Sequence, residues 1–392
     1  MGDKEKIGYF LKHKDNEVMY FEMDAKTSRI VGNNYIIDSK RLPFNLKYND
    51  DFAERTEQLS IWIKARGLTG SRKDLSNIIA INGVKDEIEL IIKSYGLNVT
   101  DHYWIHEAEI NLTWNNMNCF NNIFDKIKIN DNIDFSIDKN VKTPSPNYCV
   151  DGSIEKRWII NEKGERVLLK GSRHKIMQEP FNEVIAGKIM EEFRIFHVPY
   201  ELKSNYDLIP YSECKTMADI NNEYITANWV IGTEEYGTKE IYNHFIDICK
   251  NNGILDAKER LDEMIAIDFL IGNDDRHKGN FGILRNSDSL NWIKIAPIFD
   301  NGNSLFYDRD NESINDWGTD SLGKTFDSSN RLQLNVIDYP QWYNKSKGNI
   351  IIDIVAQELK KNIRLSDDRI AKIIEITKKR KDIFENIINK IK

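Results

Sequence analysis

The sequence predicts an α+β fold in which strand-rich parts come first and a helical part follows. Two short apolar segments, 157–160 and 166–170, flank the turn-like residues NEKG and are typical of a hairpin. The next segment, PFNEVIAGKIMEEFRIF, has Pro180 at its start and apolar residues at helical spacing. From Ile241 onward, long stretches repeat this spacing. Strands, one helix and further strands therefore precede a largely helical C-terminal part.

The N-terminal part has a different pattern and is expected to form an accessory α+β domain. Short apolar runs between residues 9 and 48 are typical of strands and turns, whereas residues 53–95 are typical of helices. Near residues 134–149 the pattern lapses into a polar stretch with two prolines, which indicates a boundary. We expect three parts: 1–140 as an accessory domain that recognises a substrate or partner, 141–225 as a sheet-rich lobe and 226–392 as a helical lobe.

The composition is that of a soluble globular protein with more than one domain. Its 392 residues exceed the size at which one core keeps growing, and 40% of them are hydrophobic. The net charge of −7 argues against direct nucleic-acid binding and against attraction to anionic membranes. The chain has no signal-like N-terminal run and no long apolar window, and its four cysteines are widely spaced. We therefore expect a cytoplasmic protein with reduced thiols.

The densest group of polar residues lies in GNDDRHKGN, residues 272–280, between an apolar helix and an apolar strand. Desolvating so many polar groups between buried elements is costly, which points to a functional site. A second apolar strand, IKIAPIFD, ends at Asp300. If the two strands form a hairpin, Asn280 and Asp300 reach the same end, where amide and carboxylate oxygens suit Mg²⁺. Asp275 is then available as a base.

The order of these residues along the chain matches that of phosphoryl-transfer enzymes. In such enzymes a loop Asp accepts the hydroxyl proton, while a later Asn and a second Asp hold the metal. Lys170 ends the strand RVLLK, and Glu183 follows in the predicted helix. This is the order of a lysine that contacts phosphates and a glutamate that orients it. The sequence therefore predicts a kinase.

These motifs resemble those of the HipA-like serine/threonine kinases, which share a DRHxxN loop and a P-x-[YF]-D strand end. The resemblance covers roughly residues 143–392. It implies a bilobal protein-kinase-like fold that uses ATP and Mg²⁺ to phosphorylate serine or threonine in a protein substrate. It also implies a toxin or effector role, with an antitoxin or regulatory protein as partner.

The same resemblance implies a role for each candidate residue. Asp275 corresponds to the catalytic base, and His277 supports the geometry of its loop. Asn280 and Asp300 correspond to the metal ligands. The nucleotide-binding positions are Lys170, Glu183 and, in the segment DGSIEKRW, Gly152, Ser153 and Lys156.

Three other functions fit parts of the sequence. A catalytically idle pseudokinase could act through partner binding, although the complete set of Asp275, Asn280, Asp300 and Lys170 argues against it. Lipid or small-molecule kinases also carry DRHxxN. GTDSLGKT, residues 318–325, matches the P-loop pattern of nucleotide hydrolases letter for letter. Because no apolar strand precedes it and no long helix follows it, we expect it to face the substrate instead.

Two further clusters have simpler interpretations. His102 and His106 have the spacing H-x-x-x-H, which on a helix would bring both rings to one face for a metal. The glutamate of H-E-x-x-H is missing, so a packed or surface pair is the simpler interpretation. The basic residues 378–381 near the C-terminus are expected to form a solvated helix face.

Overall fold

The computed structural model describes residues 6–67, 75–123, 147, 156–205, 207–232, 238–338 and 340–391. Contacts between residues divide the chain into two compact units. The first unit consists of Met1–Leu168, Ala218–Glu223 and Asn286–Leu290, and the second consists of Leu169–Met217, Tyr224–Arg285 and Asn291–Lys392. The division at about residues 140 and 225 that we expected from the sequence stays a prediction.

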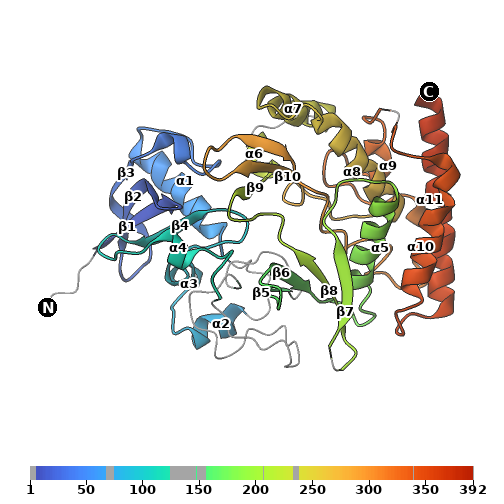
Figure 1. Ribbon diagram of the computed structural model, residues 1–392, viewed down its shortest axis with the longest axis horizontal. Helices are drawn as coiled ribbons and strands as arrows, with labels where there is room; N and C mark the ends of the chain where they lie inside the picture. The colour runs from blue at the N-terminus through green and yellow to red at the C-terminus, as the bar shows by residue number, and fades with distance from the viewer. Residues whose placement is uncertain are drawn as a thin grey trace. The chain divides into compact units, whose positions relative to one another are not determined.

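The first unit is built around a four-stranded antiparallel sheet with the strand order β3-β2-β1-β4 (Figure 1). Its strands are β1 (Lys6–His13), β2 (Asn16–Asp24), β3 (Ile30–Ile36) and β4 (Tyr103–Glu107). Its helices are α1 (Phe52–Lys64), α2 (Leu75–Ile81), α3 (Glu87–Lys93) and α4 (Trp114–Met117), with a 3-10 turn η1 (Ser39–Arg41). The strands-then-helices order expected for residues 9–95 is confirmed.

One face of this sheet is covered by α1 and α3. Alternating strand residues such as Leu11 and Phe21 point into a core that also contains Leu59 from α1 and Ile91 from α3. All of them are at most 1% exposed. The helix α1 begins where Asp51 accepts a hydrogen bond from the backbone N–H of Glu54 at 2.8 Å. The capped amphipathic helix α1 thus packs on the apolar face that the alternating strand residues form.

Two small sheets include strands of the second unit, although the strand Lys156–Ile160 belongs to the first unit. One has the order β5-β6-β8-β7, formed by β5 (Lys156–Ile160), β6 (Arg166–Lys170), β8 (Pro210–Lys215) and β7 (Tyr200–Ser204), and the unit boundary falls inside β6. The other has the order β11-β10-β9, formed by β11 (Trp292–Ile295), β10 (Gly282–Asn286) and β9 (Asn222–Thr226). The two predicted hairpins are confirmed: β5 is a neighbour of β6, and β10 pairs antiparallel with β11.

Helices make up most of the rest of the second unit. They are α5 (Glu179–Glu192), α6 (Ala227–Ile231), α7 (Thr238–Asn251), α8 (Ala257–Ile271), α9 (Asn330–Gln333), α10 (Asn349–Leu359) and α11 (Asp367–Ile391), with 3-10 turns η3 (Asp316–Thr319) and η4 (Lys345–Lys347). Pro180 lies in the first turn of α5, as predicted. Among the described residues, no helix is both long enough and apolar enough to span a lipid bilayer.

Two buried helices carry much of the second unit. α5 contacts β7, β8 and α10, and α8 contacts α5, α7, α9, α11 and β11 (Figure 1). Both helices are buried on nearly all sides, which explains why their apolar residues do not keep to one stripe. Charged side chains on such helices, among them Glu183 on α5 and Asp268 on α8, are therefore inside the protein and need partners.

We predict that Leu59→Ala on α1 lowers the free energy of unfolding by about 2–5 kcal/mol, because it leaves a cavity in a fully buried site. Ile61→Ala is the matched control, since Ile61 lies on the same helix and is 49% exposed. Its effect should stay within about 1 kcal/mol. Urea unfolding followed by circular dichroism measures both values. Equal losses for the two variants would contradict the core described here.

Candidate active site

Lys170, the last residue of β6, is buried between two carboxylates. Its Nζ donates to Glu183 on α5 and, at 2.5 Å, to Oδ1 of Asp300. Burial disfavours the charged amine, but the negative charges of Asp300 and Glu183 outweigh burial and raise the pKa of Lys170 above its usual value. Lys170 is therefore a fixed cation held beside Asp300.

Asp300 is the more accessible of the two carboxylates. The Asp300 side chain is 30% exposed, whereas that of Glu183 is 1% exposed. Oε2 of Glu183 accepts a hydrogen bond from the backbone N–H of Asn301 at 2.8 Å, so Glu183 ties both Lys170 and the chain after Asp300 to α5. Asp300 itself has a positive φ of 57°, a left-handed conformation that is uncommon for a residue other than glycine and often occurs at functional sites.

The loop after α8 presents Asp275. The helix ends at Gly272, whose φ of 64° is readily adopted by glycine and turns the chain out of the helix. In the loop, the backbone N–H of Asp275 donates to Oδ1 of Asn273 at 3.0 Å. The Asp275 carboxylate accepts from Nδ2 of Asn303 at 2.6 Å and from Nζ of Lys324 at 2.7 Å. Asp275 is 31% exposed and held at both oxygens.

Arg276 is the buried centre of this loop. Its guanidinium donates to both carboxylate oxygens of Asp268 on α8, at 2.9 and 3.0 Å. It also donates to the backbone oxygens of Asn280 and Phe299 and, at 2.6 Å, to Oδ1 of Asn301. With 1% of its surface exposed, Arg276 joins the helix, the loop and the irregular segment that carries Asp300. The strand β11 ends at Ile295, so the expectation that this strand ends at Asp300 is wrong.

Asn280 and His277 complete the loop in different ways. Nδ2 of Asn280 donates to the backbone oxygen of Asp275 at 3.1 Å, which leaves the amide oxygen as the atom suited to a cation. His277 is exposed, and its Nδ1 accepts from the backbone N–H of Gly279 at 3.0 Å. This hydrogen bond stabilises the turn.

Five of the candidate residues lie in one connected network: Lys170, Glu183, Asp275, Asn280 and Asp300. The expected pairing of Lys170 with Glu183 is present in the structure. Gly152 and Ser153 lie outside the described residues, and Lys156 is the first residue of β5 in the first unit. The assignment of these three residues to nucleotide phosphates stays a prediction.

Several residues of the network were not assigned a role from the sequence. They are Asp268, Asn301 and Asn303. Asp268 could have been found, because it is a lone acid in the apolar stretch IAIDFLIG. A charge at such a position is buried and needs a partner. Asn303 carries no comparable signal, since it lies in an irregular segment, whereas Lys324 belongs to residues 318–325, which we expected to face the substrate.

Residues 318–325 pack against the loop instead of forming a P-loop. Thr325 donates through its hydroxyl to the backbone oxygen of Arg276 at 2.5 Å, and Lys324 reaches Asp275. The 3-10 turn η3 leads into this segment and the four-residue helix α9 follows it. These neighbours differ from the strand and long helix that a P-loop requires.

Arg380, in the basic cluster 378–381 of α11, holds this segment in place. Arg380 is 3% exposed and donates to the backbone oxygen of Gly318 at 2.9 and 2.6 Å. Lys381 is also buried. The expectation of a solvated face is therefore wrong for these two residues, because α11 turns them toward the protein interior.

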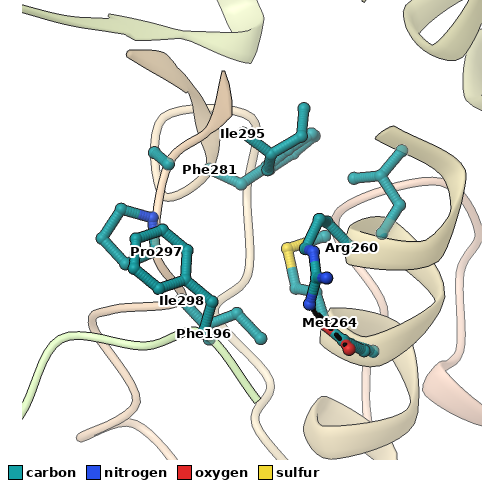
Figure 2. A pocket seen from close by; sticks show the side chains of 10 residues that line it. Phe196, Arg260, Met264, Phe281, Ile295, Pro297 and Ile298 are labelled. Atoms are coloured by element: carbon teal, nitrogen blue, oxygen red, sulfur yellow. Dashed lines mark hydrogen bonds and ion pairs between the residues drawn. The ribbon is translucent and has the colours of Figure 1, made fainter. Parts of the chain in front are cut away.

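A small, mostly apolar pocket lies elsewhere in the second unit. Figure 2 shows Arg260 and Met264 on α8 facing Pro297 and Ile298 across it. Glu263 also lines the pocket, and Nη1 of Arg260 donates to its two oxygens at 2.9 and 2.7 Å. Burial raises the pKa of Glu263 to about 7 although Arg260 opposes the shift. The pocket contains none of the candidate catalytic residues.

Comparison with known proteins identifies one relative by sequence. No protein-family model matches the chain. The serine/threonine-protein kinase CtkA of Helicobacter pylori is 31% identical over 147 residues, which amount to 35% of this chain and 45% of CtkA. The chain thus spans less than half the length of the curated relative that it matches.

The fold of this chain is also similar to that of solved structures. The complex of HipA, HipB and operator DNA from Shewanella oneidensis MR-1 matches 98% of this chain and 99% of its own matched chain, with a TM-score of 0.56 and 13% identity. A crystal structure of the Helicobacter pylori proinflammatory kinase CtkA matches 60% of this chain and 91% of that one, with a TM-score of 0.46 and 20% identity. The match to the first structure confirms the predicted kinase-like α+β fold.

We predict that Glu263 makes the stability of the chain depend on pH. Because its pKa is raised in the folded state, the neutral acid stabilises the fold below its unfolded pKa of about 4.5, and this contribution is lost as the pH rises toward 7. Between pH 4.5 and pH 8, the free energy of unfolding of wild type should therefore fall by about 2–3 kcal/mol more than that of Glu263→Gln. Urea unfolding across this range measures the difference, and parallel pH profiles would contradict the assignment.

Proposed function

We propose that this chain, which is related to the HipA-like kinases and has their fold, is an ATP- and Mg²⁺-dependent serine/threonine protein kinase. The observation that carries the proposal is the ion pair of Lys170 with Glu183 and Asp300, joined through Arg276 to the loop of Asp275. The identity to a serine/threonine-protein kinase over 147 residues supports the same activity.

Asp275 has the features of a general base for a hydroxyl group. Its carboxylate is partly exposed, and Asn303 and Lys324 each hold one of its oxygens, so the direction in which it accepts a proton is set. In the proposed reaction Asp275 takes the proton of the substrate serine or threonine hydroxyl. Lys324, with 46% of its side chain exposed, places a positive charge beside this carboxylate, where an anionic group can approach.

The residues present suit a nucleotide with a divalent cation. Asp300 offers a partly exposed carboxylate and Asn280 an amide oxygen, and both are ligand types that Mg²⁺ prefers. Lys170 supplies the protonated amine for phosphate oxygens. When bound, ATP and Mg²⁺ supply the phosphoryl group and the charge neutralisation that its transfer needs. The phosphate-contacting roles of Gly152, Ser153 and Lys156 remain proposals from the sequence motif alone.

The relatives also suggest the biological setting. HipA in the matched structure is part of a toxin–antitoxin system and is bound to HipB and operator DNA. We propose by analogy that this chain is a toxin or effector whose partner is an antitoxin or regulatory protein and whose substrate is a protein.

We predict that Asp275→Asn lowers phosphate transfer about 10²–10⁴-fold, because the amide cannot accept the hydroxyl proton. The assay incubates the full chain with labelled ATP and Mg²⁺, and measures label on the chain itself and on a generic protein substrate. Asp274→Asn is the matched control, since Asp274 is the neighbouring acid in the same loop, and it should keep most of the activity.

Retained transfer in Asp275→Asn would contradict the role of this residue. Transfer to lipid vesicles or small alcohols in place of protein would support a lipid or small-molecule kinase. ATP binding without transfer to any acceptor would support a pseudokinase.

We predict that the two lysines separate nucleotide binding from transfer. Lys170→Met should weaken ATP binding at least about tenfold, because it removes the cation between Glu183 and Asp300. Lys324→Met should leave ATP binding nearly unchanged and slow transfer, because Lys324 contacts Asp275. Calorimetric titration with ATP and Mg²⁺ measures binding, and circular dichroism checks the fold of each variant. Weaker binding in Lys324→Met alone would instead assign the phosphates to residues 318–325.

A further inference from the structure

The first unit contains a buried cluster of two histidines and a glutamate. His13 ends β1, His102 directly precedes β4, and Glu223 lies in β9 within the short segment Ala218–Glu223 of the same unit. All three side chains are 0% exposed. Oε2 of Glu223 lies 3.3 Å from Nε2 of His13 and 3.4 Å from Nδ1 of His102. We propose that these residues bind a divalent transition-metal ion, with Zn²⁺ as the preferred ion.

The distances within the cluster fit metal coordination better than strong hydrogen bonds. Hydrogen bonds between an ionised carboxylate and a charged nitrogen donor are typically about 2.7–2.9 Å long. Zinc bonds to histidine nitrogen and carboxylate oxygen are about 2.0–2.2 Å long, and tetrahedral geometry then separates neighbouring ligand atoms by about 3.3–3.6 Å. The two nitrogen–oxygen distances, 3.3 and 3.4 Å, have this length. One potential ligand atom from each residue lies within 4.8 Å of the other two.

The chemistry of the cluster also suits a metal. Two imidazoles and one carboxylate are ligands that zinc commonly takes, and a water molecule can complete four-coordination. His102 packs against aromatic rings, with its centroid 4.9 Å from that of Phe120 and 5.4 Å from that of Trp114. Its Nε2 is buried without a hydrogen-bond partner among the described residues. A metal would bind this imidazole through Nδ1, the nitrogen that faces Glu223, so Nε2 stays without a hydrogen-bond partner in the metal-bound state as well, and the case for the metal rests on the ligand set and its distances.

Arg41 opposes the binding of a cation. Its Nη1 lies 3.4 Å from Nδ1 of His13, the nitrogen that carries the proton when Nε2 binds a metal. The guanidinium also has other partners, the carboxylate of Asp38 at 3.5 Å and the backbone oxygen of Asp288 at 3.3 Å. Asp288 is a further carboxylate in this region, but Lys14 donates to it at 2.6 Å, and this hydrogen bond is the main cause of the lowered pKa of Asp288. Arg41 therefore weakens the binding of a cation to the cluster, while the carboxylates of Asp38 and Asp288 favour it.

A metal here would stabilise the first unit. Glu223 is separated along the chain by 210 residues from His13 and by 121 from His102. Bringing such distant ligands together costs chain entropy, which metal binding offsets because the site exists only in the folded state. The ion would fasten the segment that carries Glu223 to the sheet of β1 and β4. This role is independent of the proposed kinase activity.

Zinc binding by the full chain tests the proposal. Protein stripped of metal with a chelator is refolded with Zn²⁺ in the presence of excess Mg²⁺, and its zinc content is measured by mass spectrometry. Wild type should retain one zinc ion per chain with a Kd below about 1 μM, and zinc should raise its melting temperature. Co²⁺ in the same site should give the visible absorption of tetrahedral cobalt. The proposal is overturned if wild type binds zinc more weakly than this limit, or if zinc does not change its melting temperature.

Variants assign the bound ion to this cluster. His102→Gln and Glu223→Gln should each weaken zinc binding about 100-fold or more and abolish the cobalt spectrum. His106→Gln is the matched control on β4, because Nδ1 of His106 faces the backbone oxygen of Glu107. Asp300→Asn is the control for the candidate active site. Both controls should keep the zinc ion, and loss in either control equal to that in His102→Gln overturns the assignment. Circular dichroism of the metal-free variants shows whether each one is folded.

Discussion

The buried ion pair between Arg276 and Asp268 is the interaction on which the candidate active site depends. Asp268 lies on α8, so its carboxylate is fixed by a helix that is buried on nearly every side. Arg276 uses this anchor to hold the backbone at Asn280 and Phe299. Removing either charge would leave the other buried without its partner, which costs several kcal/mol. The position of the segment that carries Asp300 therefore depends on the contact of Arg276 with Asp268.

The cation at Lys170 depends in turn on this arrangement. Asp300 reaches Lys170 only because the chain before it is tied to Arg276 and the chain after it to Glu183. Glu183 is almost fully buried and so has the surroundings of an orienting residue, whereas Asp300 retains the exposure that a ligand contact needs. The two carboxylates thus differ in role because they differ in environment, although both pair with the same amine.

Residues 318–325 show how a motif can match a pattern of letters without its structure. A P-loop holds phosphates with the backbone N–H groups between a strand and a helix. Here Gly318 is held by Arg380 of α11, and Lys324 extends to the carboxylate of Asp275. The lysine therefore belongs to the surroundings of the proposed base. Because Lys324 lies beside Asp275, residues 318–325 belong to the candidate site. The P-loop pattern of the sequence does not predict this position.

Much of the fold and the core of the site could be predicted from the sequence because the signals are local. Apolar alternation, helical spacing and turn residues specify the hairpins and helices, and the end of β6 then places Lys170, whereas Asp300 lies beyond the end of β11. Only the tertiary structure decided the partners of Asp275 and Arg276 and the meeting of His13 with Glu223. Apart from the contacts of Arg276 with Asp268 and Asn280, these contacts join residues tens to hundreds of positions apart, and packing selects them without leaving a periodic signal in the chain. By itself, the sequence determined the α+β elements and the order of the kinase-like residues, because both depend on neighbours along the chain. The folded structure decided which charges face one another, because that depends on neighbours in space.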